Sequence, residues 1–508
     1  LYKSDSMMTN YSRITPASIS DTLEANTQYA VNEAPWSALS SAESSFAEYG
    51  DAAIVVFSRS GGEGADLPSG ANGTNDSWIS GSEGSGNYLE LSAEEIELLK
   101  NLKALKDNGT FKSIVVLINS SNALEMDFLN PAICGEDYGI DAAMWIGDVG
   151  QTGINGVGQL LAGTVTPSGS LVDTYLYDNL ANPAMYNFYT QAYPNAAEYD
   201  LLTEGADVQG MYSVYQEGIY LGYRYFETRY EDVVMGTAKA GDYDWATTVA
   251  YPFGYGDSYT TFAYSNFNVT ESDDAFTVTL KVTNTGKTYS GKETVQFYVS
   301  KPYGDYAKEN QIQVPSVELV EFGKTDVLAP GQTETISVSI DEKYFASFDA
   351  YGAGTYVLMP GDYYLIAATD AHNAVNDLLA AKGADSSKMV GSGDAAMTAK
   401  FTLDLNTEKY AYSDATGNPI ESVFGYADIN RYEGRGDNEV KYYDRSDWAN
   451  TVSLDRENGA AKVVATEQMA HDILKQCSVE YNIPLDKDAE AAAYPTYGKQ
   501  AGISLVDM

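Results

Sequence analysis

Two carboxylates occur in a glycine-rich stretch, FSRSGGEGADLPSG, which runs from Phe57 to Gly70. Glu63 lies among three glycines, and Asp66 follows three residues later. Glycine gives a backbone conformational freedom, and loops of this kind often carry the groups that act on a substrate. A carboxylate placed there could give or take a proton in acid–base catalysis. The plainer alternative is a solvated surface acid, and the stretch alone leaves both interpretations open.

Other residue types that do chemistry are scarce in this chain. There are two histidines, His372 and His471, and two cysteines, Cys134 and Cys477, all in unrelated settings. They form no HExxH pattern, no cysteine zinc motif and no disulfide framework, and the sequence contains no G-x-S-x-G elbow. Acid–base chemistry would therefore fall to carboxylates and tyrosines. We expect no metal and no organic cofactor.

The chain is strongly acidic. Its 72 Asp and Glu against 30 Lys and Arg give a net charge of -42 over 508 residues. Binding to a nucleic acid or an anionic membrane requires clusters of Lys and Arg, so neither is expected as a partner. No apolar run approaches the roughly 20 residues that span a bilayer, and the first residues lack the pattern of a signal peptide. The charge favours solubility in a salty or extracellular medium.

Residues 1–230 alternate strand and helix patterns and predict an α/β layered sandwich domain. A segment at 91–106 predicts a helix with Ser92 as its N-cap and Glu95 completing a capping box. Continuous apolar runs typical of parallel strands covered on both faces occur at 52–57, 113–118 and 141–147. The order strand–helix–strand at this spacing indicates a βαβ unit.

After about residue 260 the pattern changes to the period-two alternation of antiparallel strands, as in FTVTLKVTNTG (276–286). A Pro-Gly turn at 330–331 precedes another alternating strand, and Pro360-Gly361 predicts a hairpin. These signals predict an antiparallel β-sandwich. The expected order is a linker at 231–261, the β-sandwich at 262–375 and a long irregular connector at 376–508, with one helix near 465–477.

The stretch WIGDVGQTGING (145–156) has glycines that could suggest a dinucleotide site. Their spacing does not match G-x-G-x-x-G, and no acidic residue follows on a second strand. The glycines therefore indicate a turn that packs closely against a sheet, and not a cofactor site.

Four motifs occur together in an order that resembles glycoside hydrolase family 3, the large group of β-glucosidases and β-xylosidases. They are SRSGGEGAD, PSGSL, EGIYLGYRY and PFGYGDSYT, and the resemblance covers roughly residues 40 to 370. Members combine a barrel that carries an Asp nucleophile, an α/β sandwich that carries a Glu acid/base, and often a fibronectin type III-like domain. The resemblance implies that this chain holds the last two parts of a retaining, exo-acting β-glycosidase, and that its substrate is an oligosaccharide or glycoside.

By this resemblance Glu63 is the general acid/base, on a loop that reaches from the sandwich towards the barrel. Asp66 would contact sugar hydroxyls or support the loop. Arg59, as a substrate-binding residue, would pair with a carboxylate across the cleft; the alternative is a structural salt bridge. Many members have a basic residue after the loop Asp, where this chain has Leu67, so contacts to an outer sugar subsite stay open.

No barrel pattern and no nucleophile motif can be assigned in this chain. YDRSDWANTVSL (443–454) and GISLVDM (502–508) resemble the lead-in to the barrel in permuted members, where the barrel comes last. The α/β domain is also expected to lack its first strand and helix. We therefore expect a piece of a permuted enzyme, with the nucleophile on a catalytic barrel domain in the same polypeptide or in a separate fragment.

The main alternative is a non-catalytic carbohydrate-binding or cell-surface module that has kept the two accessory domains. A barrel encoded after Met508 would favour the enzyme, and a surface anchor there would favour the module. A secreted or cell-surface location in a bacterium is expected, with a cytoplasmic one left open. The sugar, the linkage and a homo-oligomeric state also stay open.

Overall fold

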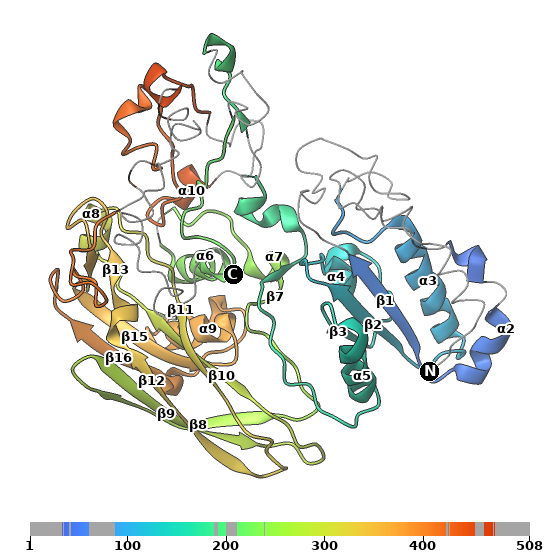
Figure 1. The fold of residues 1–508 in the computed structure, drawn as a ribbon. Coiled ribbons are helices and arrows are strands. Elements are labelled where there is room, and N and C mark those ends of the chain that lie inside the picture. Colours follow the sequence, from blue (N-terminus) through green and yellow to red (C-terminus); the bar gives the residue numbers. More distant parts are fainter. Residues whose placement is uncertain are drawn as a thin grey trace, which may run out of the picture. The chain divides into compact units, whose positions relative to one another are not determined.

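The structure is a computed structural model that describes residues 33, 35–39, 42–59, 87–186, 191–199, 211–237, 239–422, 425, 427–452, 462–470 and 472 (Figure 1). The chain divides into two compact units, each assembled from three separate stretches. The first takes the described residues within Leu1–Tyr186, Glu217–Ser422 and Tyr442–Ala460, and the second those within Asn187–Gln216, Val423–Lys441 and Ala461–Met508. Among the described residues, no helix is long and apolar enough to cross a membrane.

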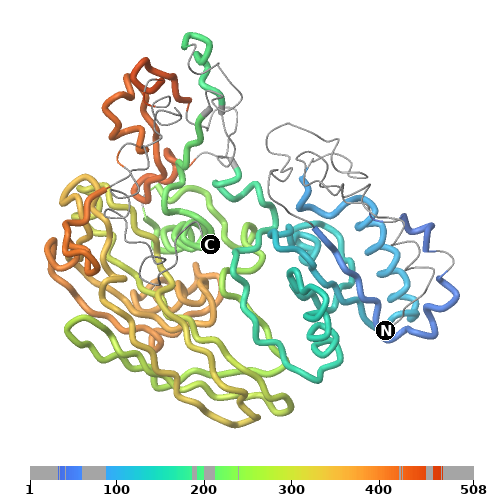
Figure 2. The backbone as a smooth tube through the Cα atoms, in the orientation of Figure 1, coloured from blue at the N-terminus to red at the C-terminus, as the bar shows by residue number. Residues whose placement is uncertain are grey.

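A three-stranded parallel sheet with the order β1-β2-β3 forms the α/β layer of the first unit. Its strands are β1 (Ala53–Arg59), β2 (Ile114–Ser120) and β3 (Ala142–Trp145), and Figure 2 follows the chain through them from blue to teal. Val55 lies opposite Val116, which in turn lies opposite Ala143. The three strands expected from the apolar runs are therefore confirmed.

Helix α3 (Ala93–Asp107) connects β1 to β2 and lies beside β1 in Figure 1. Its N-terminus has the expected capping box: the Glu95 N–H donates to Ser92 Oγ at 3.2 Å, and the Ser92 N–H donates to Glu95 Oε2 at 2.8 Å. Leu99 of the helix is fully buried in one core with Val55 of the strand. The local sequence thus sets the helix start, and its apolar face packs on the sheet.

Side chains of β1 alternate between the two faces of the sheet. Val55 and Phe57 are buried, whereas Ile54 and Val56 are 40% and 42% exposed. The expectation that these strands are covered on both faces is therefore wrong for β1. The remaining helices and strands of the first unit before the sandwich are α2 (Glu43–Phe46), α4 (Pro131–Cys134), α5 (Gly150–Leu161), β4 (Tyr175–Leu176), α6 (Tyr223–Met235), α7 (Trp245–Thr248) and β7 (Val249–Tyr251).

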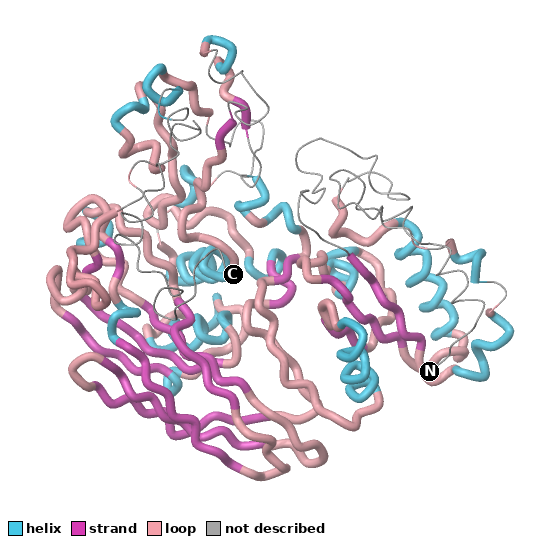
Figure 3. The backbone as a smooth tube through the Cα atoms, viewed as in Figure 1, coloured by secondary structure: helices cyan, strands magenta, loops and turns pink. Residues whose placement is uncertain are grey.

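Two antiparallel sheets form the β-sandwich, with the orders β11-β10-β15-β16 and β12-β9-β8, and their strands are drawn in magenta in Figure 3. Alternate residues of β9, Phe276, Val278, Leu280 and Val282, are buried between the sheets, as the period-two pattern requires. The strands are β8 (Phe262–Glu271), β9 (Ala275–Asn284), β10 (Thr294–Ser300), β11 (Glu318–Lys324), β12 (Thr333–Asp341), β15 (Gly361–Ala368) and β16 (Thr398–Leu403).

The turn before β12 is confirmed: the Gln332 N–H donates to the Ala329 carbonyl at 2.9 Å, and Gly331 has a φ of +80°. The hairpin at Pro360-Gly361 is wrong. β14 (Tyr356–Val357) pairs with β13 (Ser347–Phe348), whereas β15 pairs with β10 and β16. The turn residues therefore redirect the chain between two sheets.

The expected domain limits differ from the structure at three places. Helix α6 runs across residue 230, and β7 pairs with β4, so 231–261 is part of a folded layer and not a linker. Helix α9 (Ala371–Ala381) packs with α6 against β10 and β15, and β16 completes the four-stranded sheet beyond residue 375. The sandwich therefore includes chain that was assigned to the connector. Two short helices, α8 (Asp305–Glu309) and α10 (Trp448–Thr451), complete the first unit.

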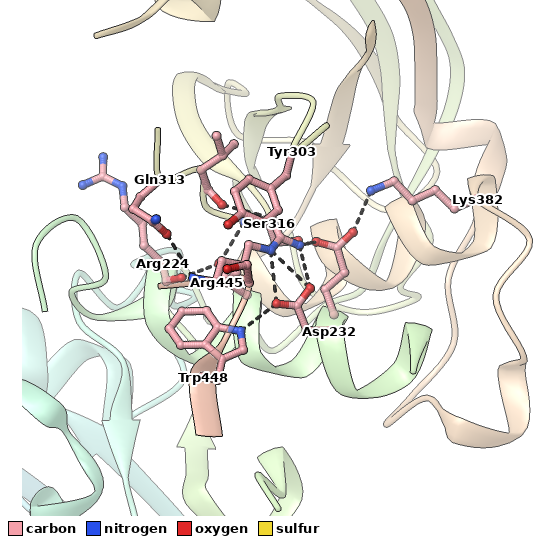
Figure 4. A network of polar contacts seen from close by, with 12 residues as sticks. Arg224, Asp232, Tyr303, Gln313, Ser316, Lys382, Arg445 and Trp448 are labelled. Carbon is pink, nitrogen blue, oxygen red and sulfur yellow. Dashed lines mark hydrogen bonds and ion pairs between the residues drawn. The ribbon is translucent and has the colours of Figure 1, made fainter. Parts of the chain in front are cut away.

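A buried ion-pair network holds α10 and the chain before it in the first unit (Figure 4). Arg445 Nη2 lies 2.6 Å from Glu231 Oε2 and 2.9 Å from Asp232 Oδ1. The Trp448 indole N–H donates to Asp232 Oδ2 at 2.7 Å, and Lys382 Nζ contacts Glu231 Oε1 at 2.6 Å. Burial alone would raise the pKa of Glu231, but the charges of Lys382 and Arg445 outweigh it and hold that pKa below its ordinary value. This part of the expected connector therefore belongs to the core.

The second unit joins early and late stretches of chain. β5 (Gln191–Ala192) pairs with β6 (Met211–Tyr212). Asn195 exchanges two hydrogen bonds, both 2.9 Å, with the backbone N–H and carbonyl of Ala465. Asn438 likewise accepts from the Val464 N–H at 2.8 Å and donates to its carbonyl at 2.7 Å. Residues 467–470 are helical, within the expected helix near 465–477, whose end lies outside the described residues.

Candidate functional site

Glu63 and Asp66 lie outside the described residues, in the segment 60–86, as does Leu67. The structure describes both ends of that segment: β1 ends at Arg59, and the description resumes at Asn87. The carboxyl ends of parallel strands meet at one edge of a sheet, and open α/β sheets bind their ligands there. The segment that carries both predicted site carboxylates therefore starts at the edge where a site is expected.

Arg59 has a fully buried side chain. Its Nε donates to the Tyr88 carbonyl at 2.7 Å, Nη1 to the Ser58 carbonyl at 3.0 Å, and Nη2 to the Glu90 carbonyl at 2.6 Å. Two further bonds, from Nη1 and Nη2, reach Glu95 Oε1 and Oε2 at 2.8 and 2.7 Å. A guanidinium has five N–H groups, and all five are used. In the structure Arg59 therefore forms a structural salt bridge, the second of its two expected roles, and none of its N–H groups is left for a substrate.

Glu125, which the sequence analysis did not single out, is buried beside the far end of the same segment. Its Oε1 accepts from Asn87 Nδ2 and from the Asn179 N–H, both at 2.7 Å. Its own N–H donates to the Leu89 carbonyl at 2.9 Å, and the Leu89 N–H donates to Asn87 Oδ1 at 3.0 Å. The sequence signal that could have identified Glu125 is an acidic residue between two apolar ones, Leu124 and Met126. A charged side chain at a buried position needs partners, and this usually reflects a specific role.

The environment of Glu125 favours its neutral form. Burial raises the pKa of this carboxyl from 4.5 to about 8, and the bond from the Asn179 N–H only partly opposes this. The negative charges of Glu90 and Asp178 act in the same direction as burial. Glu125 is therefore a carboxyl group that exchanges its proton near neutral pH, at the base of the segment 60–86.

The described residues contain no group of three or more His, Cys, Asp or Glu side chains placed to hold a metal ion. Near the carboxyl edge of the sheet they supply backbone carbonyl groups, the buried Arg59–Glu95 ion pair, and the Glu125 carboxyl, whose pKa is raised to about 8. These groups bind residues 87–90, where the described chain resumes after the segment 60–86. A complete pair of catalytic carboxylates is not found among them.

Several curated proteins that resemble this chain are named as β-glucosidases. The "Beta-glucosidase" of Ruminococcus albus is 31% identical over 332 residues, covering 65% of this chain and 28% of that protein. "Beta-glucosidase A" of Butyrivibrio fibrisolvens is 29% identical over 353 residues, covering 64% and 37%. A solved structure of β-glucosidase 3B from Thermotoga neapolitana with glucose is 25% identical, with a TM-score of 0.49, and is matched over 70% of this chain and 38% of that one. This chain thus spans about a third of the length of these relatives.

Two family models match this chain, the first over its α/β part and the second within its β-sandwich. Residues 3–223 match the "Glycosyl hydrolase family 3 C-terminal domain", and residues 293–371 match the "Fibronectin type III-like domain". The first range contains the parallel sheet and the segment with Glu63, and the second lies within the β-sandwich. The chain therefore carries a glycoside hydrolase family 3 C-terminal α/β domain, followed by a fibronectin type III-like domain.

Proposed function

We propose that this chain is the acid/base-bearing part of a retaining, exo-acting β-glycosidase of the β-glucosidase type. The observation that carries the proposal is the position of SRSGGEGAD at the carboxyl end of β1, in a family 3 C-terminal domain. The names of the related proteins support a β-glucosidase. A β-xylosidase has the same chemistry and is distinguished by the substrate panel below.

In this proposal Glu63 acts twice on an oligosaccharide or glycoside. It first protonates the glycosidic oxygen while a second carboxylate attacks the anomeric carbon, and it then takes a proton from the water that releases the sugar. The second carboxylate is expected on a catalytic barrel domain outside this chain. The route needs no cofactor, because two carboxylates supply both the proton and the nucleophile.

Two further assignments belong to the proposal. Asp66, three residues after Glu63, is proposed to contact sugar hydroxyls or to support the loop. The net charge of -42 supports a secreted or cell-surface location, because such a surface stays soluble in a salty medium.

The experiment uses Glu63→Gln in the full-length protein that contains this chain. Hydrolysis of alkyl and sugar leaving groups should slow by roughly 10² to 10⁴-fold, the usual worth of a general acid. Activated aryl glucosides and xylosides need little protonation, so their first step should change much less. Asp51→Asn is the control, because Asp51 is an exposed acid just before the start of β1, whereas Glu63 follows its end. Equal losses for both kinds of leaving group would contradict the acid role, and binding without turnover by the unaltered protein would favour a carbohydrate-binding module.

A further inference from the structure

His372 lies in the first turn of α9, is buried, and has an oxygen atom beside each of its two ring nitrogens. Nδ1 lies 2.9 Å from Glu227 Oε2, and Nε2 lies 2.8 Å from the carbonyl oxygen of Val390. A backbone carbonyl and an ionised carboxylate only accept hydrogen bonds, whereas a neutral imidazole has a single N–H to donate. Both contacts are hydrogen bonds only if the His372–Glu227 pair holds one proton more than a neutral ring and an ionised carboxylate carry.

The contacts of Trp245 favour this proton on the ring of His372. The Trp245 indole N–H, which can only donate, gives a hydrogen bond to Glu227 Oε1 at 2.9 Å. Glu227 thus accepts at both oxygens, as an ionised carboxylate does. The rings of Trp245 and His372 are also stacked, with centroids 3.6 Å apart and 19° between their planes, and an aromatic face attracts a cation. The folded structure therefore favours the imidazolium form of His372.

Separate stretches of the first unit meet at this ring. Helices α6, α7 and α9 supply the carboxylate, the indole and the imidazole, and they share one apolar core (Figure 1). The fourth stretch is the chain after α9, at Val390. Its carbonyl also accepts from Asn376 Nδ2 at 2.9 Å, and its N–H donates to Tyr230 Oη at 2.7 Å. One of the three bonds that hold residue 390 therefore depends on the charge of His372.

Acidic groups predominate around the ring. Burial alone would lower the pKa of His372, but the charge of Glu227, the bonds to Glu227 and Val390 and the charge of Asp370 together raise it above 6.5. The cation Lys382 is paired with Glu231 at 2.6 Å. At or beside the residues that contact the ring, the titratable or charged groups are Glu227, Tyr230 and Glu231 of α6, Tyr243 and Asp244 before α7, Asp370 before α9, and the exposed Lys388.

We propose that His372 is a proton-dependent latch that fastens α9 and the chain at Val390 to α6 and α7. While the ring is charged, it donates to both oxygens. When it loses a proton, one nitrogen becomes an acceptor that faces another acceptor. The carboxylate keeps the remaining N–H, because a charge-assisted bond is the stronger one, and the chain at Val390 is released.

The direction of the pH dependence follows from the raised pKa of His372. The contribution of the latch to stability is fully present below about pH 6.5, the ordinary value, and is lost as the pH rises through the value in the folded state. Alkaline pH should therefore loosen the chain at 384–394 before the rest of the first unit unfolds.

The first test is NMR of the chain labelled with ¹⁵N-histidine, which contains only two histidines. His471→Gln leaves His372 as the single signal. At about pH 6 both ring nitrogens of His372 should carry a proton, and the midpoint of its titration should lie above 6.5. Glu227→Gln should move that midpoint to lower pH. A ring with one proton at pH 6, or a midpoint below 6.5, would overturn the latch, and this measurement requires no change at His372.

The second test is hydrogen exchange of the amides of residues 384–394, corrected for the intrinsic effect of pH. Between about pH 6 and pH 9 their exchange should become about 10 to 100-fold faster, which corresponds to one hydrogen bond to a charged group. His372→Gln cannot be charged, so its exchange should be fast at both pH values. Asp385→Asn, an exposed acid in the same stretch, is the matched control and should keep the dependence. Protection that is equal at both pH values in the unaltered chain would refute the release of this stretch.

Discussion

Arg445→Met should lower the stability of the first unit substantially. In the structure Arg445 contacts Glu231 at 2.6 Å and Asp232 at 2.9 Å, with all three side chains buried. Without Arg445, Glu231 keeps Lys382, whereas among the described residues the Asp232 carboxylate keeps only the hydrogen bond from the Trp448 indole. Removing one partner of a buried pair costs about 3 to 5 kcal/mol, because it leaves a buried charge uncompensated. For a unit of this size, with an unfolding entropy of about 2.1 cal/mol/K per residue, we expect a fall in melting temperature of about 3 to 6 °C.

The assay is urea unfolding of the purified chain, followed by tryptophan fluorescence, with thermal unfolding as a second measurement. Lys239→Met is the control, because Lys239 pairs with Asp447 in the same region but is more than half exposed. Exposed pairs contribute about 0 to 1 kcal/mol, so the control should unfold almost as the unaltered chain does. A loss of less than about 1 kcal/mol for Arg445→Met would refute the argument that this network anchors the segment.

Two further predictions concern pH and activity. The folded state holds the proton of Glu125 more tightly than the unfolded state does, because the pKa of this carboxyl is raised from 4.5 to about 8. The resulting contribution to the free energy of unfolding is fully present below about pH 4.5 and is lost as the pH rises towards 8. Glu125→Gln should therefore flatten the dependence of unfolding free energy on pH between about 5 and 8, and an unchanged slope in urea titrations would count against the raised pKa. The purified 508-residue chain should show no detectable hydrolysis of a chromogenic β-glucoside or β-xyloside. It should gain activity when it is joined to or mixed with a barrel domain of about 300 residues. Robust turnover by the chain alone would show that a complete site exists within it.

Local signals in the sequence predicted the elements that local interactions form. The strands β1 and β2 follow from short apolar runs, and the start of α3 follows from Ser92 and Glu95 three residues apart. The alternation in β9 predicted which of its side chains are buried. Each of these features depends on residues within one turn or one strand, so a single sequence contains the necessary information.

Features that depend on distant partners were not predictable in the same way. β16 is a short strand that joins its sheet only after α9, so its place depends on a pairing with β15 that no local pattern reveals. Arg59 could equally have faced a ligand, and only the fold brings Glu95, 36 residues away, against it. Glu125 lies between Leu124 and Met126, but its role follows from neighbours on two other stretches of chain, at 87–89 and at 179. The roles of Glu63 and Asp66 remain predictions, because both lie outside the described residues.

The network around Arg445 can form only after the ribosome has made both of its parts, Asp232 early and Arg445 late. Arg445 lies 213 residues after Asp232, and at about 5 to 20 residues per second the ribosome needs roughly 10 to 40 s to pass from one to the other. Through that interval Asp232 of α6 lacks the cation and the indole that neutralise it in the finished unit. The newly made chain therefore holds an incomplete core for many seconds, far longer than a helix or hairpin takes to form.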